Sequence, residues 1–338
     1  MKRIFSISLL VLSAINVMAA VSRSSFGLSS SESAAVADTT VVITYSGNSA
    51  SVSVASNIKN YVSYTANGAH VVVNQAASVG ANSSGEITYI LKGSSSNGSF
   101  YLTGAYKATV SLQGLTLTNP DSAAINIQNG KRINISSKSG TVNTISDGAN
   151  GAWKGALMCK GHSEFQGRGT LNVYGNTAHA IWSKEYVEIK NCTINVMSAV
   201  KDGLHCQQYF LMESGVLTIK GFGSDGIDVG IKDSTLVGDA VDTGNFTQTG
   251  GSITIYMSGA TGEGVTYVGK KSCTGGTLSI VGTSAVEDVR FEQNEPVMIY
   301  TLLGVRLGEY LLQDAKETLP RGIYIVEQNG TSRKVVLE

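Results

Sequence analysis

The repeat that determines the fold is clearest in residues 169–228, GTLNVYGNTAHAIWSKEYVEIKNCTINVMSAVKDGLHCQQYFLMESGVLTIKGFGSDGID. In this stretch, Ile181, Leu204 and Ile227 recur at a constant interval, since 204 − 181 and 227 − 204 both equal 23. The same interval separates a second set of apolar residues, each within a short alternating run: Leu171, Ile194 and Leu217. Two sets of positions with one shared period indicate a structural repeat.

Each repeat contains two or three alternating runs of four to five residues, separated by Gly, Asn, Asp or Ser, which are strand and turn signals. One such unit cannot bury its apolar face alone, whereas stacked units share a continuous core and pair their strands. We therefore predict an all-β fold in which residues 39–286 form a right-handed parallel β-helix of about ten turns. The alternative is a sandwich of antiparallel hairpins, but hairpins recur about every 8 to 12 residues.

The composition fits this fold and excludes several classes of protein. Glycine accounts for 39 of the 338 residues and proline for 3. Glycine suits tight corners, whereas proline would remove hydrogen-bond donors from a sheet. The 25 basic and 25 acidic residues cancel, so nucleic-acid binding lacks its electrostatic basis. With 42 % hydrophobic residues, the chain also differs from a disordered one.

Residues 1–20 are typical of a secretory signal peptide, with a basic start, an apolar run at 4–17 and a small-residue exit. This run is short compared with the roughly 20 residues that cross a bilayer, so we expect cleavage rather than a membrane anchor. No later segment is long and apolar enough to span a membrane. Residues 21–38, which are rich in Ser and Ala, are expected to form a flexible linker.

The four cysteines would meet oxidising conditions after export, but their spacing matches no metal-binding pattern. We expect small buried hydrophobic residues rather than disulfides at Cys159, Cys192, Cys206 and Cys273.

Alternation along a strand sends the residue after each core position outward. It places Trp182, His205 and Asp228 in one column, with Lys184 in the neighbouring column. An aromatic ring beside polar groups suits a pyranose, whose C–H face packs on the ring while its hydroxyls need hydrogen bonds. The sequence thus predicts a carbohydrate-binding surface at these four residues, with a solvated outer face as the alternative.

The corner before these strands is a column of His179, Asp202, Asp225 and Glu263, so three carboxylates are in register. Carboxylates one strand spacing apart repel each other, so either a pKa rises or a cation such as Ca²⁺ binds between them. The expected metal ligands are Asp202, Asp225, Asp228, Asp239 and Asp242. The alternative is that Asp merely caps backbone amides at turns.

The acidic motif of residues 225–228 is repeated at residues 239–242, so two registers compete in this region. Either Asp225 or Asp239 begins the turn that ends in Ile253.

The order of several motifs resembles a family of secreted bacterial carbohydrate-binding-domain proteins, whose right-handed β-helix is similar to that of pectate lyases. These motifs are ITYILKG (87–93), VSLQGL (110–115), AINI (124–127), GRGTLNV (167–173), KDGLH (201–205) and SDGID (224–228). The resemblance implies calcium-stabilised binding of plant cell-wall polysaccharide, including acidic galacturonan, without cleavage. It implies Asp202 and Asp225 as calcium ligands, with Asp228 beside them.

Residues 287–338 carry antiparallel strand and hairpin signals outside the repeat. They resemble the C-terminal sorting domain of type IX secretion substrates, a small β-sandwich. That resemblance implies the outer-membrane secretion machinery as a partner and a secreted or cell-surface location. In purely physical terms, the segment is expected to cap the open end of the β-helix.

The leading functional hypothesis is a non-catalytic carbohydrate-binding protein. A polysaccharide lyase is one alternative, with Lys184, Lys201 or Lys232 as the base. A hydrolase would use two of the carboxylates of Asp225, Asp228, Asp239 and Asp242. The third alternative is a surface adhesin whose β-helix is only a spacer.

Overall fold

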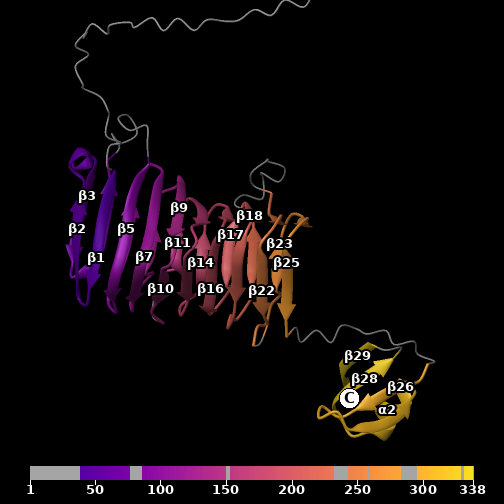
Figure 1. Ribbon diagram of the computed structural model, residues 1–338. Helices are drawn as coiled ribbons and strands as arrows, with labels where there is room; N and C mark the ends of the chain where they lie inside the picture. The colour runs from indigo at the N-terminus through magenta and orange to yellow at the C-terminus, as the bar shows by residue number, and fades with distance from the viewer. Residues whose placement is uncertain are drawn as a thin grey trace, which may run out of the picture. The chain divides into compact units, whose positions relative to one another are not determined.

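The computed structural model describes residues 39–76, 86–149, 153–231, 243–257, 259–282, 295–328 and 331–337. They form a parallel β-solenoid of about 8 turns and a small C-terminal sheet (Figure 1). The predicted all-β parallel architecture is therefore confirmed. The predicted signal peptide and linker, residues 1–38, lie outside the described residues.

Most turns of the solenoid contain three short strands, one on each of three faces. One face is a nine-stranded sheet in the order β23 (Val265–Tyr267), β20 (Ile227–Gly230), β17 (Leu204–Gln207), β14 (His179–Ser183), β11 (Gly155–Cys159), β8 (Ile125–Ile127), β6 (Gly98–Thr103), β4 (Ala69–Gln75) and β3 (Val62–Asn67).

The other two faces belong to one sixteen-stranded sheet. The first of them contains β24 (Lys271–Cys273), β21 (Asn245–Gln248), β18 (Tyr209–Met212), β15 (Val187–Ile189), β12 (His162–Gln166) and β9 (Arg132–Ser137). The second contains β10 (Val142–Asp147), β13 (Thr170–Tyr174), β16 (Cys192–Ser198), β19 (Gly215–Ile219), β22 (Ser252–Tyr256) and β25 (Thr277–Val281). The long strand β7 (Ala108–Asn119) pairs with both β9 and β10 and so joins the two faces. It also pairs with β5 (Ile87–Ser95).

The register confirms the predicted repeat. Ile181 pairs with Leu204, which pairs with Ile227, and all three side chains are fully buried. Gly203 shows why glycine recurs at the corner, because a Cβ there would meet the carbonyl oxygen of Gly226 at 2.8 Å. Stacked turns thus come closer at this corner than a larger residue would allow.

The solenoid has about 8 turns rather than the ten expected, because several turns are longer than the basic repeat. From Ile227 to its partner Val265 the numbering advances by 265 − 227 = 38. Strands β20, β21 and β22 lie within this turn, so Asp225, which lies just before β20, begins the turn that contains Ile253. Asp239 itself lies outside the described residues.

Two antiparallel hairpins form the N-terminal end of the solenoid, which the sequence analysis did not predict. Strand β1 (Thr40–Ser46) folds back onto β2 (Ser49–Val54), and β3 folds back onto β4. The turns contain Gly47 and Gly68, whose φ angles of +58° and +60° favour glycine. The 3-10 helix η1 (Ser56–Ile58) connects the hairpins and buries Ile58 in the solenoid core.

The C-terminal region is a four-stranded antiparallel sheet in the order β27 (Arg306–Tyr310), β26 (Val297–Tyr300), β28 (Gly322–Gln328) and β29 (Thr331–Leu337). Helix α2 (Leu312–Thr318) buries Ala315 against Val297, Ile299 and Val326 of this sheet. The predicted C-terminal β-region is confirmed, but its described residues form one sheet covered by a helix and not two facing sheets. Its predicted roles in capping and sorting remain predictions.

The four cysteines are free thiols. Cys159, Cys192 and Cys206 are buried, as expected, whereas Cys273 is exposed on the edge strand β24, so the prediction for it was wrong. In the described part of the chain, no helix has the length and apolar character needed to cross a membrane.

Candidate functional site

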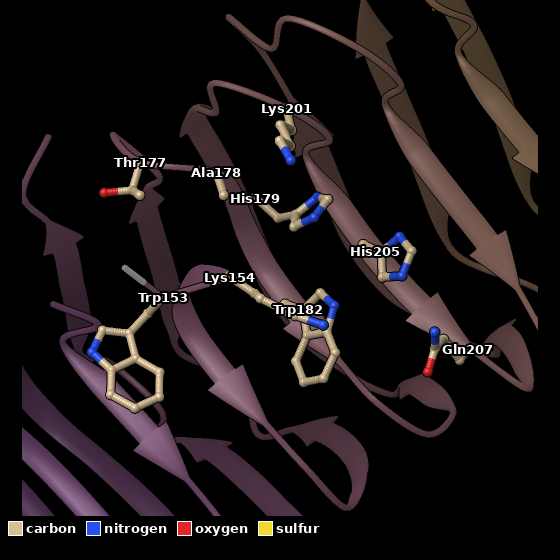
Figure 2. Close-up of a pocket in the computed structure, with 9 residues that line it drawn as sticks. All are labelled: Trp153, Lys154, Thr177, Ala178, His179, Trp182, Lys201, His205 and Gln207. Atoms are coloured by element: carbon tan, nitrogen blue, oxygen red, sulfur yellow. The ribbon is translucent and has the colours of Figure 1, made fainter. Parts of the chain in front are cut away.

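A cavity of about 480 Å³ opens on the nine-stranded face, over β11, β14 and β17 (Figure 2). It is lined by Trp153, Lys154, Thr177, Ala178, His179, Trp182, Lys201, His205 and Gln207. Two residues of the predicted carbohydrate-binding column, Trp182 and His205, are among them.

The predicted outward column exists in the predicted register. Trp182 pairs with His205, and His205 with Asp228, on three consecutive strands. The rings of Trp182 and His205 are nearly parallel, with centroids 6.5 Å apart. His205 Nδ1 lies 2.8 Å from Asp228 Oδ2. Lys184 follows β14 and does not line this cavity.

Trp182 is less accessible than a sugar platform requires, since only 5 % of it is exposed. It clusters with Ala123 and Met158, and Lys154 Nζ lies 4.6 Å above its ring. The open aromatic residue of the cavity is Trp153, which is 37 % exposed.

Trp153 also lines a second cavity of about 270 Å³ on the same sheet. That cavity lies over β4, β6 and β8 and is lined by residues that include His70, Tyr101 and Asn126. The two cavities share one exposed tryptophan, Trp153, and so adjoin each other on the nine-stranded face.

The sequence analysis missed Trp153 and Lys154 because they lie in the glycine-rich segment 148–155, GANGAWKG, before β11. Trp153 and Lys154 themselves precede β11 and so lie outside the strand columns that the repeat defines. The only signal was that the chain has just 2 tryptophans.

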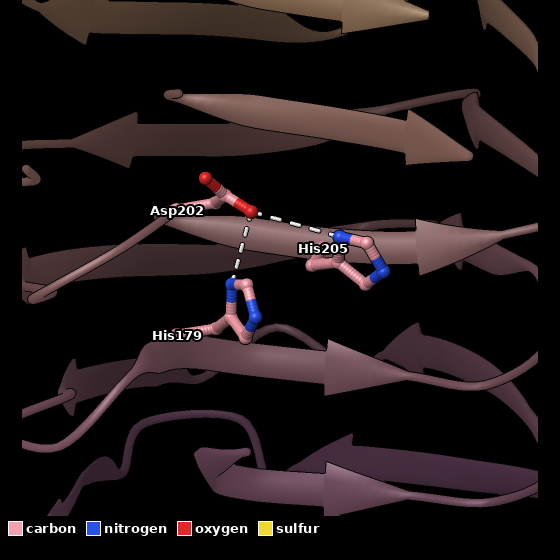
Figure 3. Close-up of side chains that lie close together, drawn as sticks. All are labelled: His179, Asp202 and His205. Atoms are coloured by element: carbon pink, nitrogen blue, oxygen red, sulfur yellow. Dashed lines mark ion pairs between the residues drawn. The ribbon is translucent and has the colours of Figure 1, made fainter. Parts of the chain in front are cut away.

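A buried carboxylate holds two histidines at the edge of the first cavity (Figure 3). Asp202 Oδ2 lies 3.0 Å from His179 Nδ1 and 3.6 Å from His205 Nδ1. The two imidazole centroids are 4.9 Å apart. Asp202 therefore links two consecutive turns through one oxygen.

These contacts shift the pKa values of Asp202 and His205 in opposite directions. Burial alone would raise the pKa of Asp202, but the nearby nitrogens of His179 and His205 outweigh burial and hold it well below its usual range. Burial would lower the pKa of His205, yet its contacts with Asp202 and Asp228 raise it to about 9. The two carboxylates thus favour the protonated form of His205.

The corner carboxylates also cap backbone amides, which is the alternative role considered for them. Asp202 Oδ1 accepts a hydrogen bond from the Asp225 N–H at 3.1 Å, and Asp225 Oδ1 accepts one from the Glu263 N–H at 2.6 Å. Each caps the next turn of the solenoid.

These contacts decide whether Ca²⁺ fits at Asp202. Calcium takes six to eight oxygen ligands, whereas one oxygen of Asp202 faces a backbone amide and the other faces two imidazole nitrogens. Asp202 therefore does not fit a calcium shell. Asp228 contacts His205, while Asp239 and Asp242 lie outside the described residues.

The two lysines of the cavity, Lys154 and Lys201, form no ion pair within the described ranges. Figure 2 shows both side chains at the cavity. Their ammonium groups are available to an anionic ligand.

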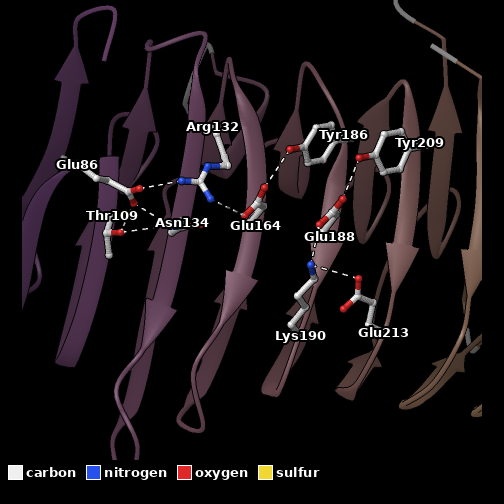
Figure 4. Close-up of polar contacts among 10 residues, drawn as sticks. All are labelled: Glu86, Thr109, Arg132, Asn134, Glu164, Tyr186, Glu188, Lys190, Tyr209 and Glu213. Carbon is white, nitrogen blue, oxygen red and sulfur yellow. Dashed lines mark hydrogen bonds and ion pairs between the residues drawn. The ribbon is translucent and has the colours of Figure 1, made fainter. Parts of the chain in front are cut away.

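On the face of β9, β12, β15 and β18, a second row of ionisable side chains is internally paired (Figure 4). Arg132 bridges Glu86 at 2.9 Å and Glu164 at 3.5 Å. Tyr186 and Tyr209 stack at 4.6 Å and donate their hydroxyls to Glu164 and Glu188 respectively. Lys190 lies 3.2 Å from both Glu188 and Glu213. We call this set the paired row.

Comparison with known proteins adds two findings. A family model described as carbohydrate-binding domain-containing protein matches residues 75–298. The solved structure of a polysaccharide lyase-like protein from C. thermocellum, in a gadolinium derivative, aligns with a TM-score of 0.52 and 19 % identity, covering 72 % of this chain and 98 % of the other. At this identity the likeness shows the fold alone. No curated protein matches the chain.

Proposed function

This chain belongs to the family of carbohydrate-binding domain-containing proteins, and we propose that its nine-stranded face binds an acidic polysaccharide without cleaving it. The observation that carries the proposal is the cavity in which an exposed tryptophan lies with two lysines that no described carboxylate pairs.

The lining of the cavity supports a sugar ligand. Trp153 offers an accessible ring for the C–H face of a pyranose, and the second cavity on its other side extends the surface. A polymer could therefore occupy both cavities and contact Trp153 between them.

The charges of the cavity support an acidic ligand. Lys154 and Lys201 carry positive charge at its wall, and the imidazolium of His205 adds a third cation whose partners are Asp202 and Asp228. Uronate carboxylates are the anionic groups of plant cell-wall polysaccharide that would match such cations.

The contacts of His205 argue against its use as a general base. Two carboxylates near its Nδ1 raise its pKa, so His205 is poorly suited to abstract a proton from a uronate.

Calcium remains a prediction for Asp225, Asp228, Asp239 and Asp242. We propose that any such ion binds apart from Asp202, whose contacts do not suit it. A thermal melt in Ca²⁺ and in chelator, with Asp225→Asn as the variant, tests this proposal; a transition unaffected by Ca²⁺ would reject it.

We also propose that the protein is exported. The signal-like pattern of residues 1–20 and the resemblance of residues 287–338 to a sorting domain support this. Fractionation of cells that produce the full chain, or the chain truncated after residue 286, tests it; surface exposure that survives the truncation would reject the sorting role.

The main experiment measures the binding of the full chain to polygalacturonate and to a neutral glucan by isothermal titration calorimetry. We expect Trp153→Ala and Lys201→Ala each to weaken binding to polygalacturonate by at least about 10-fold. Ultraviolet absorbance is followed in parallel, because a lyase would release unsaturated products.

The matched controls are Tyr256→Ala and Lys220→Ala on another face. Tyr256 is 39 % exposed, and Lys220 Nζ lies 5.4 Å from its ring, so this pair resembles that of the cavity in chemistry and exposure. Equal losses in the controls would reject the cavity as the site. A growing absorbance would instead reject binding without cleavage.

A further inference from the structure

We propose that His179, Asp202 and His205 form a binding site for one divalent transition-metal ion of the zinc class, at the edge of the cavity. This site shares His205 with the proposed polysaccharide surface, but its occupancy is tested with the metal alone.

The distances within the cluster suit such an ion. One ligand atom from each of the three residues lies within 4.8 Å of the others. Nitrogen and oxygen ligands of a tetrahedral zinc ion lie about 2.0–2.1 Å from the metal and hence roughly 3.3 Å from each other. The distances from Asp202 Oδ2 to the two imidazole nitrogens, 3.0 and 3.6 Å, are on either side of that separation. Small side-chain rotations would therefore complete the site.

His179 provides a second observation that points to a ligand. Its Nδ1 atom is buried and lies 3.0 Å from Asp202 Oδ2, yet among the described residues it has no partner with hydrogen-bond geometry. The contact with Asp202 thus has the distance of an ion pair without the alignment of a hydrogen bond. A metal ion between the two atoms would use the lone pair of this nitrogen.

The local charges can balance a divalent ion. The carboxylates of Asp202 and Asp228 lie 3.6 and 2.8 Å from His205 Nδ1, so two acidic side chains are close enough to balance the charge of a divalent ion. Lys154 and Lys201 lie in the same cavity, so they would favour an anion as the ion's remaining ligand.

The donor set selects the class of metal. Imidazole nitrogens suit zinc, nickel, copper and cobalt, whereas calcium requires oxygen ligands. Two histidines and one carboxylate also leave one position of a tetrahedral ion open. Because His179 and His205 line the cavity, that position would face it (Figures 2 and 3). The backbone N–H of Asp225 donates a hydrogen bond to Oδ1 of Asp202. This bond fixes the orientation of the carboxylate, as hydrogen-bond partners of metal ligands commonly do.

The test uses the full chain, stripped with chelator and titrated with Zn²⁺ against a competing chromophoric chelator. We expect one zinc equivalent per chain, not displaced by excess Ca²⁺. Titration with Co²⁺ should give the visible absorption bands of a four- or five-coordinate ion. His179→Ala and His205→Gln should each weaken Zn²⁺ binding by at least about 10-fold. Substitutions of Asp202 are avoided because it also caps a turn.

The control is His70→Gln, on the same sheet but hydrogen-bonded to Ser99 and Asn97. It should leave Zn²⁺ binding unchanged, and circular dichroism should show that all variants are folded without metal. The proposal is overturned if stripped protein takes up no zinc equivalent, if Ca²⁺ displaces the zinc, or if Co²⁺ shows only the weak bands of an aqua ion. It is equally overturned if folded His179→Ala binds Zn²⁺ as tightly as the unmodified chain.

Discussion

The nine-stranded face and the face that bears the paired row both carry ionisable side chains along the solenoid, one turn above another. In the paired row, Arg132 and Lys190 each lie between two glutamates. The hydroxyls of two tyrosines donate hydrogen bonds to glutamates of the same row. On the nine-stranded face, Asp202 holds two histidines, while the lysines beside it have no carboxylate partner among the described residues.

The difference shows how one repeat can serve two purposes. Where each charge has a partner on its own or the neighbouring turn, the row contributes to stability and offers few free charges to a ligand. Where the described residues supply no partner and the segment before β11 places a tryptophan beside the strands, the same spacing produces a cavity with cations at its wall.

The largest effect should follow removal of the buried carboxylate in Asp202→Ala. Loss of the partner of two imidazoles and of the cap on Asp225 should lower the free energy of unfolding by about 3–5 kcal/mol, as measured by urea denaturation. In the paired row, Glu213→Ala is the matched truncation. Its side chain is 43 % exposed, so we expect a loss of less than about 1 kcal/mol. Similar losses in both variants would show that the charged contacts of the two faces contribute equally to stability, against our expectation.

The next largest effect is a pH dependence of the free energy of unfolding, caused by His205 on the nine-stranded face. The pKa of His205 is raised in the folded protein from 6.5 to about 9, so its stabilising contribution is complete below about pH 6.5 and is lost as pH rises through about 9. Urea denaturation in chelator should show this loss, on the order of 2–3 kcal/mol. His205→Gln should flatten the curve over that range; an equally steep curve in the variant would assign the loss to other groups.

A smaller effect is expected when the paired row loses a cation in Arg132→Met. Glu86 and Glu164 would lose their shared partner, but the Arg132 side chain is 36 % exposed, so solvent screening limits the cost to about 1–2 kcal/mol. Urea denaturation measures the change, and polygalacturonate binding should stay the same. Weakened binding would show that the two faces are coupled.

The smallest effect is expected for Tyr209→Phe, which removes the hydroxyl that donates to Glu188 at 2.9 Å. Lys190 remains beside that carboxylate, so we expect a loss of only about 0.5–1 kcal/mol in a urea titration. A loss above that of Arg132→Met would indicate that the tyrosine stack, and not the cation, dominates the row.

The repeat made the solenoid and its columns predictable. A constant interval fixes which residues face one another, so the juxtaposition of Trp182, His205 and Asp228 followed from counting alone. The cluster of His179 and Asp202 followed only in part, because the corner column was read for its carboxylates and not for its histidine.

Features outside the repeat were not predictable in the same way. The exposure of Trp153 and the contact of Lys154 with the Trp182 ring involve two residues that precede β11 and belong to no periodic pattern. The N-terminal hairpins and helix α2 likewise arise from local turns and tertiary packing. The sequence analysis placed the N-terminal strands in the parallel β-helix and predicted no helix in the C-terminal region.

The hairpins at the N-terminal end have a consequence for how the solenoid is built. Their turns join adjacent strands over very few residues, whereas each later parallel pair closes a loop as long as a whole turn of the solenoid, at a greater entropic cost. Once β1 and β4 are in place, each later turn can add to an edge that already exists. We therefore expect assembly to run in the direction of synthesis, with the first hairpins as its template.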